Sequence, residues 1–180
     1  MEEVRPTTEM MWWTTLALAA VDAGLLLLVG RLVLREVFVR LKWWTAAAAF
    51  LVYAGLWCTF ASCLYWDLVY GRLFPVWSRW LLPVGYGLLF ASLALLFWWA
   101  SLRMPGRPVV TFCLLGGLVS VPGHAVGIAR GLLRVPFLSQ VSPASALTLG
   151  VAEFIVYWAL IVALAGAMLR FAGGARGASA

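Results

Sequence analysis

Five long apolar runs alternate along the chain with short segments that hold most of the charged residues. The runs cover about residues 11–34, 45–69, 80–102, 109–133 and 144–171. None alternates polar and apolar positions with the period of two that marks a half-buried strand. Each run gives roughly 35–40 Å of helix at about 1.5 Å per residue, enough to cross a hydrocarbon layer of about 30 Å with some tilt. The pattern predicts an all-α chain in which residues 1–180 form one bundle of five transmembrane helices.

The composition supports a polytopic integral membrane protein. Hydrophobic residues make up 64% of the chain and charged residues 11%, whereas a soluble domain carries about 25% charged residues. The net charge is +6, but the basic residues fall mostly between the apolar runs. This placement favours contact with lipid phosphates over contact with nucleic acid. Pairs such as Trp12–Trp13 and Trp43–Trp44 lie at run ends, as in the aromatic belt of a membrane protein. We expect the lipid bilayer as a partner and no nucleic acid.

The basic residues also predict an orientation. Five spans put the two ends of the chain on opposite sides of the membrane. One side receives Arg31, Arg35, Arg40, Lys42, Arg103, Arg107, Arg170 and Arg176. The other side receives Arg5, Arg72, Arg79, Arg130 and Arg134. Because cytoplasmic loops carry the excess of Lys and Arg, we expect the N-terminus outside and the C-terminus in the cytoplasm, in the plasma (inner) membrane.

The fourth run, 109–133, is unusual for a simple membrane anchor. It contains Pro122 and His124, the only histidine of the protein. A proline inside a helix removes one backbone hydrogen bond and bends the helix. Gly123, Gly127 and Gly131 recur every fourth residue, which gives the helix a stripe without side chains. Small residues at this spacing allow two helices to approach closely in a membrane, so the stripe predicts a close helix contact.

Polar side chains inside the apolar runs are the candidates for a functional site. An ionised acid at the centre of a bilayer costs at least about 2.5–3.5 kcal/mol, and such residues usually face the bundle interior. The predicted topology puts Asp22, His124 and Glu153 at similar depth, from the midplane to the outer half. Tyr157 follows Glu153 by one helical turn, and Arg130 follows His124 by about two turns. The sequence predicts one shared ligand-binding pocket, although each polar group also fits a structural hydrogen bond.

The remaining candidates favour structural roles. Asp67 is expected to form an interfacial ion pair with Arg72. Cys58, Cys63 and Cys113 lie in apolar runs and are expected to be buried, inert thiols. Neither CxxC nor a zinc spacing occurs in the sequence, so no metal site is expected, and the sequence indicates no cofactor. The segment 103–108 reads as a tight polar turn, with Pro108 in the first turn of the next helix.

Two functional classes remain open. In the first, the protein is a small integral membrane subunit or a small-ligand-binding module, whose partners are other membrane subunits or a hydrophobic small molecule. In the second, it is a small membrane enzyme that acts on a lipid or isoprenoid-like substrate by acid–base chemistry. We favour the first class, because the acids have no recognisable catalytic spacing.

Overall fold

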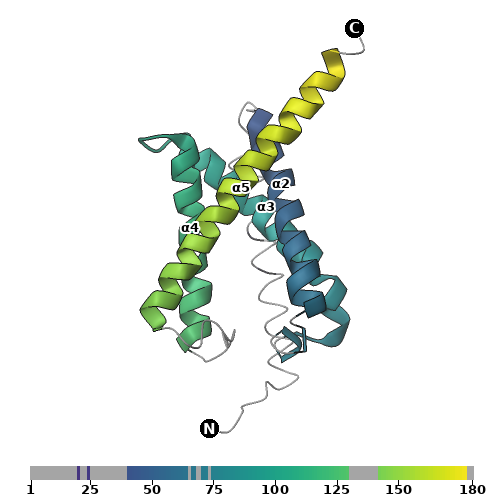
Figure 1. Ribbon diagram of the computed structural model, residues 1–180, viewed down its shortest axis with the longest axis vertical. Helices are drawn as coiled ribbons and strands as arrows, with labels where there is room; N and C mark the ends of the chain where they lie inside the picture. The colour runs from purple at the N-terminus through teal and green to yellow at the C-terminus, as the bar shows by residue number, and fades with distance from the viewer. Residues whose placement is uncertain are drawn as a thin grey trace.

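The computed structural model describes residues 40–64, 66–67, 70–72, 74–129 and 142–177, together with Ala20 and Gly24. This part of the chain is helical and contains no strand. Its long helices are α2 (Arg40–Leu56), α3 (Leu82–Ser101), α4 (Pro108–Ala129) and α5 (Pro143–Gly177). Figure 1 shows α5 crossing the other three helices, with its C-terminal part projecting beyond them. Packing is most extensive between α2 and α3 and between α4 and α5, while α5 also contacts α2.

Three helices are apolar and long enough to cross a membrane. They are Leu41–Leu64, Leu82–Ser101 and Pro143–Gly173. In α4, the apolar helical stretch within the described residues is Pro108–Pro122, which is shorter than these three helices. The predicted helices 80–102, 109–133 and 144–171 therefore correspond to α3, α4 and α5, and α5 extends six residues further. The predicted run 11–34 lies outside the described residues, apart from Ala20 and Gly24, which are both helical.

The second predicted run, about 45–69, differs from the helix at both ends. The helix already begins at Arg40, and after Leu56 it continues as a π-helix, η1 (Trp57–Leu64), where it stops. Lys42 lies within the first turns and is buried, although it was assigned to a polar loop. The long apolar stem of a lysine packs against apolar neighbours, so a lysine can belong to a helix within the bundle. Hydropathy therefore places the start of this helix too late.

The segment after Leu64 is more ordered than the predicted short loop. It contains two 3-10 helices, η2 (Tyr70–Arg72) and η3 (Val76–Trp80). Trp66, Phe74 and Leu82 form a small buried cluster there. The ring of Trp57 stacks on Tyr86 of α3 with centroids 3.7 Å apart. Aromatic packing, which a hydropathy profile does not register, thus holds this end of the bundle together.

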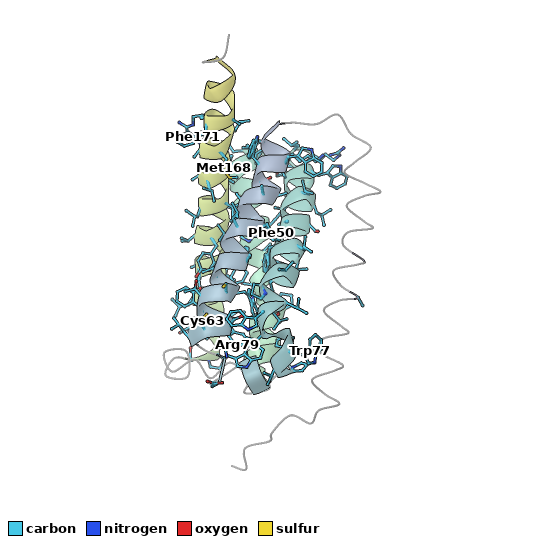
Figure 2. All side chains as sticks on the ribbon, turned by 90° about the vertical axis from the view of Figure 1, so that its right-hand side faces the viewer. Phe50, Cys63, Trp77, Arg79, Met168 and Phe171 are labelled. Atoms are coloured by element: carbon cyan, nitrogen blue, oxygen red, sulfur yellow. The ribbon has the colours of Figure 1, made fainter. Side chains whose placement is uncertain are left out.

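Arg79 joins the end of η1 to η3. Its Nε donates a hydrogen bond to the backbone oxygen of Ser62, and the hydroxyl of Ser62 donates to the backbone oxygen of Arg79 over 2.7 Å. The oxygen of Ser62 is one of the last carbonyls of the helix, which lack partners within the helix itself. A cation at this position also balances the negative end of the helix dipole. Figure 2 shows Cys63 and Arg79 at the same end of the bundle, opposite Met168 and Phe171. We call the end with Arg79 the lower end.

The connection between α3 and α4 lies at the upper end and agrees with the predicted polar turn. The helix α3 ends at Ser101, and α4 begins at Pro108. Gly106 has a φ of 116°, a backbone conformation that suits glycine because it has no Cβ. The bundle is therefore built from helices that run alternately down and up (Figure 1).

The core is organised around Trp158 of α5, which is fully buried. Its ring lies 5.1 Å from Phe112 of α4, 5.3 Å from Phe97 of α3 and 6.2 Å from Tyr53 of α2, measured between centroids. A Cβ added at Gly116 would lie 2.1 Å from the Trp158 ring. One tryptophan therefore touches all three neighbouring helices, and a glycine makes the space for it.

The close approach of α4 and α5 lies earlier in α4 than the predicted glycine stripe. It involves Gly116, which faces Trp158, and Gly117. A Cβ added at Gly117 would lie 2.5 Å from the side chain of Ile155. Gly131 lies outside the described residues, and the surroundings of Gly123 and Gly127 are not described either. The close contact predicted for this stripe therefore stays a prediction. Between α2 and α3, Gly87 accommodates Phe50 in the same way, because an added Cβ would lie 2.8 Å from the phenyl ring.

We expect Gly116→Ala to destabilise the bundle by about 1–3 kcal/mol, the usual cost of overpacking a well-filled core. The new methyl group would overlap the fully buried Trp158 ring. Gly55→Ala is the matched control, because a Cβ at Gly55 meets nothing within 4 Å. That change should be neutral or stabilising by up to about 1 kcal/mol through helix propensity. Thermal unfolding in detergent micelles measures both variants, and equal effects would contradict the packing of Trp158 on Gly116.

Candidate functional site

The clearest polar contact within an apolar helix joins Glu153 and Tyr157 of α5. The two residues are four apart, so they lie one above the other on the helix surface. The hydroxyl of Tyr157 donates a hydrogen bond to Oε1 of Glu153 over 2.7 Å. Glu153 is exposed and Tyr157 is half-buried. A hydrogen bond to a carboxylate is about twice as strong as one between neutral groups, so the phenol fixes one oxygen of the acid.

The orientation of α5 puts this pair beside α2. Ile155 and Trp158 are the side chains that face the glycines of α4. Glu153 lies two positions before Ile155 and therefore points away from α4. Tyr157 lies edge-on to Tyr53 of α2, with ring centroids 6.3 Å apart. The acid thus lies at the outer margin of the contact between α2 and α5.

The structure brings two of the predicted site residues together and does not describe the others. Asp22 and Arg130 lie outside the described residues. The backbone of His124 belongs to α4, but its side chain lies outside the described residues. The shared pocket of Asp22, His124 and Glu153 therefore stays a prediction. Within the described helices, Glu153 is on the surface and not in the interior.

Tyr53 of α2 was missed by the sequence analysis. Its side chain is only 4% exposed, and its ring stacks on Phe90 of α3 with centroids 3.5 Å apart and an interplanar angle of 8°. Its hydroxyl has no hydrogen-bond partner in the described part of the chain. The signal in the sequence was a tyrosine in the middle of an apolar run, distant from both run ends.

The helix α4 continues through Pro122 as far as Ala129. Ser120 is buried, and its hydroxyl donates to the backbone oxygen of Gly117 over 2.8 Å. A serine that bonds back into its own helix often accompanies a bend. This hydroxyl is therefore satisfied inside α4.

The remaining candidates do not form a second site in the described residues. Asp67 is exposed, and the side chain of Arg72 lies outside the described residues, so their ion pair stays a prediction. The expectation of buried cysteines is wrong for Cys58 and Cys63, which are exposed, and correct for Cys113. Both exposed thiols lie on η1 and project from the outer surface of the bundle. No group of three histidine, cysteine or acidic residues suited to a metal occurs in the described part.

Comparison with known proteins gives no relative. The chain matches no protein-family model, no curated protein and no solved structure.

The Glu153–Tyr157 contact predicts an energetic coupling between these residues. Glu153→Gln and Tyr157→Phe should each lower the free energy of unfolding, and the double variant should lose about 0.5–1 kcal/mol less than the sum, because the bond is lost only once. Pairing Glu153→Gln with Tyr86→Phe is the control, since Tyr86 stacks on Trp57 at the lower end. That pair should be additive. Additive losses in both cycles, measured by thermal unfolding, would show that the contact has no energetic role.

Proposed function

We propose that the protein is a small integral membrane subunit or small-ligand-binding module of a larger membrane assembly. Three apolar helices of membrane-spanning length support the membrane location. In this proposal the run 11–34 supplies a further span and α4 also crosses the bilayer. The polar site is built on Glu153 and Tyr157 and is completed by Asp22, His124 and Arg130.

The exposed position of Glu153 is the observation that carries the proposal. The residue lies ten positions after Pro143, about 15 Å along α5, and therefore well inside a hydrocarbon layer of about 30 Å. Its side chain is exposed on the described bundle and is bound to Tyr157. An acid that faces lipid is costly, and the cost falls when the acid is paired with a polar or charged group. A polar group of a bound molecule or of another span at this face would therefore lower the cost.

The described charges support the orientation. Lys42, Arg103 and Arg107 belong to the upper end of the bundle. Arg170 does too, because it directly precedes Phe171 in the sequence, and Figure 2 labels Phe171 at that end. Arg79 belongs to the lower end. The positive-inside rule then assigns the upper end to the cytoplasm, so Glu153 and Tyr157 belong to the half of α5 that begins on the outer side. The N-terminus is then outside and the C-terminus in the cytoplasm.

Cysteine labelling tests the orientation. In a variant with Cys58, Cys63 and Cys113 replaced by alanine, single cysteines at Arg107 and Ser142 report the two ends, because both residues are exposed. We expect a membrane-impermeant maleimide to label Ser142→Cys in intact cells and Arg107→Cys only after permeabilisation. The reverse pattern would invert the topology.

Copurification tests the role of Glu153. We expect the wild-type protein to retain a stoichiometric partner or apolar molecule in mild detergent and Glu153→Gln to lose most of it while remaining folded. The control is Thr148→Val, since Thr148 is an exposed polar residue of α5 whose hydroxyl bonds its own helix. Retention by Glu153→Gln would contradict the proposal. Catalytic turnover by the protein purified alone would instead favour an acid–base enzyme acting on a lipid or isoprenoid-like substrate.

A further inference from the structure

The π-helix η1 carries two cysteines, Cys58 and Cys63, and both side chains are exposed. In an α-helix, residues five apart are separated by about 1.4 turns and point to different sides. A π-helix is wider, because each of its backbone hydrogen bonds joins residues five apart instead of four. Residues five apart in η1 therefore stand one above the other, as residues four apart do in an α-helix. The two thiols consequently share one face of η1.

The exposure of the side chains in η1 follows this five-residue spacing. Cys58 and Cys63 are both exposed, and so are the residues that follow them, Thr59 and Leu64. Ser62 is fully buried, although it lies four positions after the exposed Cys58. In an α-helix these two residues would lie on the same face. The burial pattern therefore agrees with the backbone in placing both thiols on the outer side of η1.

Contacts at the lower end hold η1 in this conformation. Ser62 and Arg79 are joined by two hydrogen bonds, in which each residue binds the backbone oxygen of the other. The guanidinium carbon of Arg79 also lies 5.3 Å from the ring centroid of Trp80 and 5.9 Å from that of Trp66. Because these contacts direct Ser62 into the bundle, the next residue, Cys63, stays on the outer surface. π-Helical turns are rare and are frequently found at functional sites.

We propose that Cys58 and Cys63 form a redox-active dithiol that closes to an intramolecular disulfide. The third cysteine, Cys113, is buried in α4 and takes no part. The proposed orientation puts η1 at the outer side of the membrane, and disulfides form and persist in oxidising compartments of this kind. The inference uses neither Glu153 nor the ligand site and therefore goes beyond the proposed function.

The oxidant is a disulfide compound, and closure proceeds by thiol–disulfide exchange. The thiolate of Cys63, the next-to-last residue of η1, attacks one sulfur of the oxidant and releases the first thiol. The thiolate of Cys58 then attacks the Cys63 sulfur of the mixed disulfide and releases the second thiol. The two cysteines together lose two electrons and two protons, and the disulfide of the oxidant gains them as two thiols.

Closure requires a small movement at the end of η1. Residues on adjacent turns of a helix have Cβ atoms about 5–6 Å apart, whereas a disulfide needs about 3.5–4.5 Å between them. The helix ends at Leu64, one residue after Cys63. Because the last carbonyls of a helix have no partners within it and helix ends fray, a shift of about 1–2 Å at Cys63 breaks little of η1.

Oxidised glutathione is the probe, added to the reduced full chain in detergent. Lys42 and Arg72 flank the two cysteines, so a single tryptic peptide, 43–72, contains both thiols, and Cys113 falls in another peptide. We expect peptide 43–72 to lose the mass of two hydrogens and to resist alkylation, while Cys113 stays reduced. Mass spectrometry after acid quenching measures both peptides over time.

Single replacements test the order of attack. Cys58→Ser should keep one glutathione on Cys63, because the thiol that would release it is absent. Cys63→Ser should form no internal disulfide. Cys113→Ser should close at the wild-type rate, since this thiol lies outside the pair.

A variant with the thiols six residues apart is the matched control. Cys63→Ala combined with Leu64→Cys keeps two exposed thiols, because Leu64 is 61% exposed, but it moves the second thiol off the face that Cys58 occupies. We expect closure at least tenfold slower than in the wild-type chain.

Equal closure rates in the wild-type chain and the six-apart variant would overturn the inference. A disulfide-linked dimer on a non-reducing gel, in place of the internal disulfide, would overturn it as well. Glu153→Gln, which is expected to lose the copurifying molecule, should close at the wild-type rate. The dithiol and the proposed function therefore fail separately.

Discussion

The packing of Trp158 against the backbone of α4 is the contact on which the rest of the bundle depends. Because Gly116 has no side chain, the indole ring lies where a Cβ would otherwise be, and from there it reaches rings on α2, α3 and α4. This contact sets the rotation of α5. With Trp158 and Ile155 directed at α4, Tyr157 is directed at α2 and Glu153 at the outer surface. The same glycine that closes the core therefore determines where the acid is presented.

The helices were predictable from the sequence because their signal is simple. In the described part of the chain, apolar runs with few charges form helices, and α3, α4 and α5 begin close to the predicted positions, although α5 ends later than predicted. The failures have physical causes. Lys42 belongs to a helix because its stem is apolar, although its charge suggests a loop. The segment around Trp66 and Phe74 folds into 3-10 helices around aromatic contacts between residues distant in sequence, and a run average contains no information on such contacts.

In the candidate site, only the contact between residues close in sequence was predictable. The spacing of Glu153 and Tyr157 is sufficient to predict their contact, since residues four apart on a helix are neighbours. The role of Tyr53 was not predictable, because its neighbours Phe90, Tyr157 and Trp158 come from two other helices. Gly116 and Gly117 were missed because an adjacent pair does not fit the four-residue spacing that was sought. Whether Asp22 and His124 complete the site depends on helix neighbours that periodicity does not specify.

The central claim is that the polar residues of several spans converge on Glu153 in the outer half of the bundle. A density map of the full chain in a lipid nanodisc, at a resolution that shows side chains, tests this claim most directly. The account predicts that the carboxyl group of Asp22 and the imidazole of His124 lie within a few ångströms of one another and of the Glu153–Tyr157 pair, shielded from lipid. Side chains of Asp22 and His124 on separate sides of the bundle, with Glu153 facing lipid alone, would contradict it.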